Sequence, residues 1–350
     1  MELHTAAPLT GARLERVRAF LQTQGLRMGE DAGFTVLLQE EGRVLGTGSL
    51  CGNVLKYIAV DPALEGQGAC AQLVSELVGE AYRQGRTHLF LYTKPETAPL
   101  FSSLGFYPLI KTRDMAMLES RKGGLEAYLA GLQRGQGVQG ACVMNASPFT
   151  LGHRYLLETA ARQVDTLHVF IVSQDNGPFS PALRREMAQA GAADIPNILW
   201  QDCGSYLVSA ATFPTYFIKD RARAEDAQAD LDIALFAQKI APTLSITRRF
   251  VGTEPFCPIT ARYNQRMAEE LPRYGIQLIQ LPRKDAISAS PGPGGHGCGK
   301  LGGGTAAGAP KHVCKIAKSP LTRSWKPGNA GPPCKGAPFP PTGAPCFALP

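Results

Sequence analysis

The stretch Met144-Asn145-Ala146-Ser147-Pro148-Phe149-Thr150-Leu151-Gly152-His153-Arg154 decides the fold of the larger part of this chain. It lies between a hydrophobic run, which predicts a strand, and an amphipathic pattern, which predicts a helix. Gly152 permits close approach of the backbone to a ligand, and the start of the helix directs N–H groups and a partial positive charge at it. Because Thr150 and His153 are three residues apart, their side chains are expected to face the same anion. A triphosphate is the natural ligand of such a loop.

Segments typical of strands and helices alternate from this loop to residue 290. The predicted strands are Val138–Met144, Leu167–Ser173, Ile198–Gln201, Arg249–Gly252 and Gln277–Leu281, and the helices between them include Gly152–Val164, Pro181–Ala190 and Ala227–Ile240. Such alternation predicts a parallel, doubly wound α/β sheet of the Rossmann type. Ligands of that architecture bind at the carboxyl ends of the strands, where the quoted loop begins.

Residues 1–118 have a different pattern, which is typical of a mixed α/β domain. A helix behind the candidate cap Thr10 comes first, and the later predicted elements are strands at 34–39, 43–51, 54–60 and 88–92 and helices at 69–84 and 98–103. The motif Leu104-Gly105-Phe106-Tyr107 is predicted to end this domain. A helical pattern from Ser120 to Gln136 is the expected connector, so the predicted domain limits are 1–118, 119–136, 137–290 and 291–350.

The last 60 residues contain 13 Gly, 12 Pro, seven Lys or Arg and no Asp or Glu. This composition cannot bury enough apolar surface to offset the entropy of ordering. A natural disordered tail is one interpretation, and translation in a shifted reading frame is the favoured one, because a recognisable motif breaks off after Ser290. Residues 1–290 hold 29 bases and 29 acids, so they lack the basic face of a protein that binds nucleic acid.

Several other classes of protein are also excluded by the sequence. No apolar run approaches the roughly 18 residues of a membrane span, and the first 11 residues do not resemble a signal peptide, so a cytoplasmic protein without a membrane partner is expected. The nine cysteines match no zinc spacing, so no metal ligand is assigned and reduced thiols are expected. No Ser-His-Asp or Cys-His arrangement indicates an enzyme nucleophile.

The loop itself resembles a known signature, the Thr/His-x-Gly-His motif of the nucleotidyltransferase superfamily. The run from Ser147 to Arg154 is also similar to the Asn-Pro-Phe-Thr-Leu-Gly-His-Arg typical of citrate lyase ligases, with serine in place of asparagine. Three further segments resemble the same family: Ala211–Phe217, Arg249–Pro258, and Phe179-Ser180 with Arg184. The resemblance spans about residues 30–290.

The resemblance implies site residues in this second domain. His153 would stabilise the α-phosphate while diphosphate leaves, together with Thr150 as the second catalytic residue. The implied ATP-binding residues are Asn145, Pro148, Phe149, Gly152, Arg184, Gly252, Glu254, Ser288 and Ser290. Arg184 and Lys219 are candidate phosphate clamps, and the carboxylate of Glu254 could accept hydrogen bonds from ribose or adenine.

Ser288 and Ser290 belong to a motif that is interrupted. The superfamily usually carries Ile-Ser-x-Ser-x-x-Arg near its carboxyl end, where hydroxyls and an arginine reach the phosphates. Here Ile287-Ser288-Ala289-Ser290 is followed by Pro291-Gly292-Pro293. Loss of such a charged clamp typically costs about 3 kcal/mol of transition-state stabilisation.

The first domain resembles the GNAT-type acetyltransferases in Tyr57–Pro62 followed by Glu65–Cys70. In that family, backbone N–H groups at a helix start bind the pyrophosphate of coenzyme A. The residues implied in binding a thiol or coenzyme A-like group are Val60, Gly66, Gln67, Gly68 and Ala69, whereas Glu65 and Cys70 replace the outer positions of the usual motif. Only Asp61 and Glu96 are candidate bases, and by residue type alone, so this domain is expected to hold a partner's thiol arm.

Together the resemblances imply an acid–thiol ligase that activates citrate lyase. Its expected ligands are ATP with Mg²⁺, which phosphates and water would largely hold, and acetate. The expected partner is the acyl-carrier subunit of citrate lyase, which bears a thiol on a dephospho-coenzyme A-derived group. An acetyl-adenylate would form, and AMP and diphosphate would be released.

Two alternatives to this function remain at the level of sequence. One is a nucleotidyltransferase of coenzyme A-type cofactor metabolism, and AMP formation that requires both acetate and the thiol carrier would exclude it. The other is a module that binds coenzyme A-like groups without catalysis, and acetate-driven ATP–pyrophosphate exchange would exclude it.

Overall fold

The computed structural model describes residues 1–173, 178–207, 217–218 and 221–282. Contacts divide the chain into Met1–Ala307 and Gly308–Pro350, and the second of these units lies outside the described residues. The described residues form two sheets with packed helices, which confirms the expected mixed α/β class. We call the sheet nearer the N-terminus, with its helices, the first domain, and the other the second domain.

The second domain is built on a parallel sheet of five strands. These are β8 (Gln139–Met144), β9 (Thr166–Ile171), β10 (Ile198–Gln201), β11 (Ile246–Gly252) and β12 (Gln277–Leu281). The spatial order is β10-β9-β8-β11-β12, and every neighbouring pair is parallel. All six residues of β9 are buried, as expected for a strand covered on both faces.

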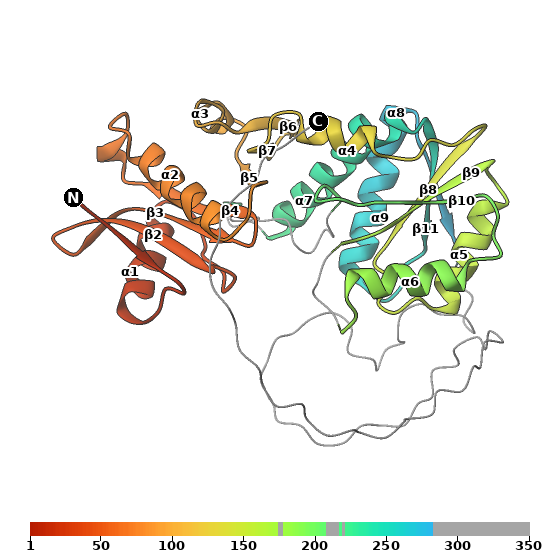
Figure 1. Cartoon of the computed structure of the whole chain (residues 1–350), viewed down its shortest axis with the longest axis horizontal. Coiled ribbons are helices and arrows are strands. Elements are labelled where there is room, and N and C mark those ends of the chain that lie inside the picture. The colour runs from red at the N-terminus through yellow and green to blue at the C-terminus, as the bar shows by residue number, and fades with distance from the viewer. Residues whose placement is uncertain (174–177, 208–216, 219–220, 283–350) are drawn as a thin grey trace, which may run out of the picture. The chain divides into compact units, whose positions relative to one another are not determined.

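Helices cover both faces of this sheet (Figure 1). On one face lie α5 (Leu151–Ala161) and α6 (Pro181–Gly191), and on the other lie α7 (Arg221–Leu235) and α9 (Pro258–Glu270). A π-helix at Phe236–Ile240, α8 (Ala241–Thr243) and a 3-10 turn at Leu271–Tyr274 complete this part. The predicted doubly wound sheet is therefore confirmed.

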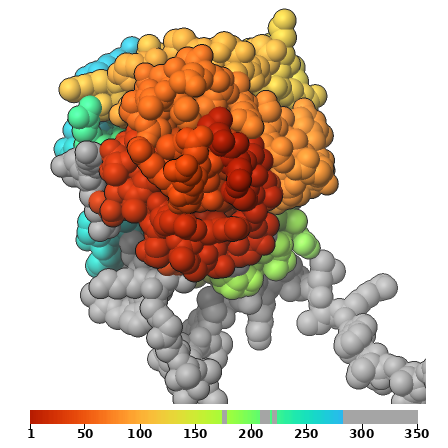
Figure 2. Space-filling model, turned by 90° about the vertical axis from the view of Figure 1, so that its left-hand side faces the viewer, coloured from red at the N-terminus to blue at the C-terminus, as the bar shows by residue number. Residues whose placement is uncertain are grey.

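The first domain contains a mainly antiparallel sheet of seven strands. These are β1 (Glu2–Ala6), β2 (Phe34–Glu40), β3 (Arg43–Cys51), β4 (Val54–Val60), β5 (Phe90–Thr93), β6 (Tyr107–Lys111) and β7 (Ala116–Glu119). Their order is β1-β2-β3-β4-β5-β7-β6, and β4 and β5 form the parallel pair. Figure 2 shows the face on which the early residues of this domain, coloured red to orange, lie at the surface.

Each face of the first sheet has its own apolar core. Helices α2 (Ala69–Arg83) and α3 (Ala98–Ser103) pack on one face, and α1 (Gly11–Thr23) packs on the other. Thr10 occupies the N-cap position of α1, as predicted, although its side chain makes no capping hydrogen bond. Beyond the motif Leu104–Tyr107, strands β6 and β7 complete the sheet up to Glu119, so this motif does not end the sheet.

The connector is shorter than the sequence indicates. Instead of a helix over 120–136, the structure has α4 (Gly124–Ala130), which ends at Gly131. Side chains of α4 and α7 pack with residues of β5, β6 and β7 in one apolar cluster. Among the described residues, no helix has the length and apolar character that crossing a membrane requires. The exact domain limits remain predictions.

Candidate active site

The second sheet has a switch point between its central strands β8 and β11. From β8 the chain proceeds outward to β9 and β10, and it then returns to place β11 on the opposite side of β8. The loops that leave β8 and β11 therefore diverge to opposite faces, and in this architecture a ligand crevice is expected between them, at the carboxyl ends of the strands. The predicted motifs at 145–154 and 252–254 follow these two strands.

Thr150 and His153 form a hydrogen-bonded pair at the start of α5. Thr150 is the N-cap residue, and its backbone N–H donates to His153 Nδ1 at 3.0 Å, while its Oγ1 lies 2.9 Å from the same nitrogen. Because a backbone N–H can only donate, Nδ1 is an acceptor and the neutral imidazole carries its proton on Nε2. The pair predicted to meet an anion is therefore brought together, with the threonine orienting the histidine.

Phe149 fixes the other side of the His153 ring. The two rings stack with centroids 5.6 Å apart and planes 23° apart. The edge of Phe149 packs against Gly191 at the end of α6, so closely that a Cβ atom there would lie 2.6 Å from Cε1. Arg154 joins the same two helices, since its Nη1 donates to the Gly191 carbonyl at 2.7 Å. The start of α5 is thus held against the end of α6.

Arg184 was predicted to clamp phosphate, and the structure gives it a contact with the loop itself. Its side chain is only 1% exposed, and Nη1 donates to Asn145 Oδ1 at 2.5 Å and to the Asn145 carbonyl at 2.6 Å. Ser180 caps α6 by accepting from the backbone N–H of Leu183 at 3.3 Å. The cap and the arginine one turn later explain the Phe-Ser-x-x-x-Arg spacing, and contact of Arg184 with ATP remains a prediction.

Gly252 and Glu254 lie on the β11 side of the crevice. A Cβ atom at Gly252 would meet no atom of the described residues within 4 Å, so these residues leave space for a ligand there. Glu254 Oε1 accepts from the backbone N–H groups of Phe256 and Cys257, each at 3.1 Å. The carboxylate therefore closes the turn that leads into α9.

The five other predicted positions lie in the same loop or outside the described part of the chain. Pro148 follows Ser147 through a cis peptide bond, and Gly152 is the second residue of α5. Ser288, Ser290 and Lys219 lie outside the described residues. The same holds for most of the segment 211–217.

The first domain contains a cavity of about 510 Å³ between β4 and β5. These strands pair only at Val54 with Phe90 and at Leu55 with Leu91, so they separate beyond this point. The β3–β4 register shifts in the same region, and Tyr57 of β4 has a φ of 57°. The irregular strand β4 thus diverges from β5 and leaves room for a ligand.

The predicted thiol-binding residues largely surround this cavity. Val60, Gly66, Gly68 and Ala69 line it, whereas the Gln67 side chain turns back and donates to the Ala63 carbonyl at 2.8 Å. Gly66 and Gly68 have φ values of 75° and 79°, which favour glycine, and a Cβ atom at either would meet no atom of the part of the chain that is described within 4 Å.

The remaining lining is apolar with a polar end. Apolar side chains include Ile58, Leu64, Leu91, Leu100, Phe101 and Leu104, and polar ones include Thr93, Lys94 and Thr97. Tyr92, Lys94 and Phe217 also line the cavity, although the sequence did not predict them as binding residues. Asp61 and Glu96 are not among the lining residues, and Asp61 instead accepts from Ala63 N at 3.0 Å.

These features define a class of protein: a doubly wound α/β domain joined to an α+β domain that has a cavity between two diverging strands. Known proteins make the assignment specific. A family model described as "Citrate lyase ligase C-terminal domain" matches residues 139–291. The chain is 42% identical over 280 residues to a "[Citrate [pro-3S]-lyase] ligase" of Klebsiella pneumoniae, with 77% of this chain and 82% of that protein covered. It is 36% identical over 281 residues to the protein of that name from Escherichia coli K12, with 77% and 80% covered.

The chain belongs to the citrate lyase ligase family. Among solved structures, Escherichia coli ElaA matches with a TM-score of 0.30 and 13% identity, covering 34% of this chain and 99% of that one. An acyl-CoA N-acyltransferase from Pseudomonas aeruginosa matches with a TM-score of 0.29 and 16% identity, covering 34% and 96%.

Proposed function

We propose that this protein activates citrate lyase by acetylating the thiol prosthetic group on its acyl-carrier subunit. Acetate and ATP would give acetyl-adenylate and diphosphate, and the thiol would then take the acetyl group and release AMP. Membership of the citrate lyase ligase family supports the overall reaction. The observation that carries the mechanism is the Thr150–His153 pair at the β8–β11 switch point.

The nucleotide step would take place at the start of α5. A carboxylate oxygen of acetate forms a bond to the α-phosphorus of ATP, and the bond from this phosphorus to the bridging oxygen of diphosphate breaks. His153 Nε2–H and the first backbone N–H groups of α5 would donate to the oxygens on which negative charge develops. Thr150 and Phe149 would hold the imidazole in place for this task.

Magnesium would enter this site with ATP. Among the described residues, no group of three or more His, Cys, Asp or Glu side chains could hold a metal ion. The phosphates and water would therefore be the main ligands of Mg²⁺, which would neutralise charge on the leaving diphosphate.

The thiol step would use the cavity of the first domain. Its apolar walls suit a pantetheine-like chain, and the glycine-bearing loop before α2 offers N–H groups for a phosphate group. The thiolate attacks the acetyl carbonyl of acetyl-adenylate, the C–O bond to phosphate breaks, and AMP leaves. The thiol loses its proton before attack, and the phosphate of AMP retains the bonding electrons.

The test is His153→Ala in acetate-driven ATP–pyrophosphate exchange. We expect the exchange rate to fall by about 10²–10³-fold, because one charge-stabilising donor is lost. His4→Ala in β1 is the matched control and should leave the rate unchanged. Unaltered exchange in His153→Ala would contradict the proposed role, and a nucleotide product other than AMP would contradict the proposed reaction.

A further inference from the structure

Tyr92 lies between the cavity of the first domain and helix α7. Its ring lines the cavity and is only 4% exposed, and it belongs to one apolar cluster with Leu231 and Leu235 of α7. Burial raises the pKa of the Tyr92 hydroxyl, and the carboxylate of Asp232 raises it further. Leu231 directly precedes Asp232 in α7, so a molecule in the cavity would touch a side chain that packs in the same cluster as the neighbour of Asp232.

Asp232 is an incompletely satisfied buried carboxylate. It is 6% exposed, and Oδ2 accepts a hydrogen bond from the Tyr263 hydroxyl of α9. Within the described part of the chain, Oδ1 has no hydrogen-bond partner. A buried carboxylate oxygen without a donor is costly, so a small rearrangement that brings a donor to it is favourable.

Arg249 of β11 is the cationic neighbour of Asp232. It is 4% exposed, and its guanidinium lies 4.3 Å from the centre of the Phe236 ring. Burial raises the pKa of Asp232, and the positive charge of Arg249 partly opposes this rise. Its Nε and Nη1 atoms also find no hydrogen-bond partner among the residues that the structure describes. The charges of this buried group are thus only partly compensated, and their arrangement is sensitive to small displacements.

Both neighbours of Asp232 stand on elements that form the nucleotide crevice. Arg249 is three residues before Gly252 on β11, and Tyr263 lies in the second turn of α9, whose first turn follows the Glu254 turn. A shift of Asp232 therefore acts on both sides of the β11–α9 junction.

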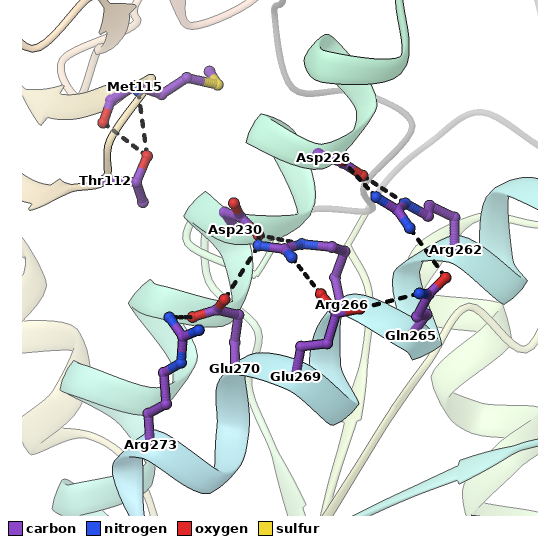
Figure 3. Close-up of polar contacts among 10 residues, drawn as sticks. All are labelled: Thr112, Met115, Asp226, Asp230, Arg262, Gln265, Arg266, Glu269, Glu270 and Arg273. Carbon is purple, nitrogen blue, oxygen red and sulfur yellow. Dashed lines mark hydrogen bonds and ion pairs between the residues drawn. The ribbon is translucent and has the colours of Figure 1, made fainter.

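Ion pairs join α7 to α9 (Figure 3). Arg262 of α9 donates twice to Asp226 of α7, each time at 2.8 Å. One turn further along both helices, Arg266 donates twice to Asp230, at 2.9 and 2.7 Å. The first pair is bidentate, the second places two donors on one carboxylate oxygen, and together they oppose sliding of one helix along the other.

We propose that Asp232 is a positioning residue that links occupancy of the first-domain cavity, through Tyr92, to the geometry of the nucleotide crevice, through Tyr263 and Arg249. The proposal rests on the proposed function, since a pantetheine-type thiol is taken as the occupant. An occupant that moves the Tyr92 ring changes the polar surroundings of Asp232 and shifts the β11–α9 junction. Binding of the thiol arm then changes the affinity for the nucleotide, and binding of the nucleotide changes the affinity for the thiol arm by the same factor.

The test measures this coupling by binding and does not depend on turnover. The full-length protein is titrated by calorimetry with α,β-methylene-ATP and Mg²⁺, with and without saturating S-methyl-dephospho-coenzyme A, whose blocked sulfur cannot accept an acetyl group. The Kd for the ATP analogue should differ by at least about fivefold between the two conditions. The reverse titration should give the same factor.

Two variants test whether Tyr92 and Asp232 carry the coupling between the two ligands. In Tyr92→Phe, which keeps the ring and removes the hydroxyl, the factor should fall below about twofold, and Asp232→Asn should behave alike. Tyr82→Phe, the same substitution at an exposed residue of α2, should keep the wild-type factor. A wild-type factor of one, or an undiminished factor in Tyr92→Phe, would overturn the inference. Failure of the proposed function would appear separately, as absence of acetate-driven exchange in the wild type.

Discussion

Gly191 determines how closely Phe149 approaches α6, and through Phe149 it determines where the His153 ring lies. The position that a Cβ atom of residue 191 would take is already filled by the Phe149 ring edge. The same Phe149 ring stacks on the imidazole of His153. A residue that has no side chain therefore contributes to placing the imidazole.

We expect Gly191→Ala to lower both stability and activity. The added methyl group must displace the Phe149 ring, which should cost about 1–3 kcal/mol of unfolding free energy. Displacement of His153 should slow acetate-driven exchange by about tenfold or more. Urea unfolding and exchange rates measure the two effects. Gly79→Ala in α2 is the control, because the nearest atom to its Cβ is Arg83 Nη1 at 3.6 Å; equal behaviour of both variants would refute the role of Gly191.

At the scale of elements, local patterns predicted much of the secondary structure. The helix Ala98–Ser103 and the strands Ile198–Gln201 and Gln277–Leu281 are confirmed to the residue. Strand β6 was missed because Pro108 indicates a break, yet β6 is an edge strand, where proline is tolerated. Periodicity also could not show that the helix after Leu235 continues as a π-helix.

The contacts of the candidate site are of two kinds, between residues close in the sequence and between residues far apart in it. The Thr150–His153 pair was predictable because residues three apart meet in one helical turn. The contact of Arg184 with Asn145 joins residues 39 apart, and that of Gly191 with Phe149 depends on the packing of α6 against the loop. Such contacts are set by tertiary structure, which a single sequence does not display. The sequence therefore indicated which loop is the candidate site, and the structure adds the contacts that support this loop.

The contact between α7 and α9 leads to a prediction of its own. Arg266 is 18% exposed and bonds to Asp230, Glu269 and Glu270. Burial raises the pKa of Asp230, and the bond to Arg266 opposes this. Arg266→Met should lower the unfolding free energy by about 1–2 kcal/mol, since a half-buried carboxylate loses its partner.

The control for Arg266→Met is Arg273→Met. Arg273 is 69% exposed and makes a single bond to Glu270 at 3.0 Å, so its loss should change stability by less than about 0.5 kcal/mol. Urea midpoints at constant m-value compare the two variants. Equal losses would mean that the ion pairs between the helices add nothing to stability.

At the scale of the whole molecule, α7 belongs to the cores of both domains. One part of its surface joins the cluster that includes β5, β6 and β7, and another joins the cluster beneath β11. Two further bonds tie the domains: Arg223 of α7 pairs with Asp114, and the Tyr206 hydroxyl donates to the buried Glu119 at 2.7 Å. Because these contacts are numerous and largely apolar, we expect the two domains to unfold together.

His168 makes this global stability depend on pH. It is fully buried on β9, and burial lowers its pKa to about 4. Its Nε2 lies 2.8 Å from Gln139 Oε1 and its Nδ1 lies 2.8 Å from Gln201 Nε2. The Gln201 amide nitrogen donates to Nδ1, so a second proton on the ring would break that bond. Folding therefore requires the neutral imidazole.

In the unfolded chain, His168 takes up its proton below about pH 6.5, whereas in the folded protein it does so only near pH 4. The unfolded state binds more protons in this interval, so stability should fall by up to about 3 kcal/mol as the pH drops from 6.5 to 4. Urea unfolding at a series of pH values measures the slope. In His168→Gln, whose side chain does not titrate, the slope of the unfolding free energy against pH should decrease by the contribution of about one proton. His4→Gln in β1 should leave this slope unchanged. An unchanged slope in His168→Gln would show that other groups cause the acid sensitivity.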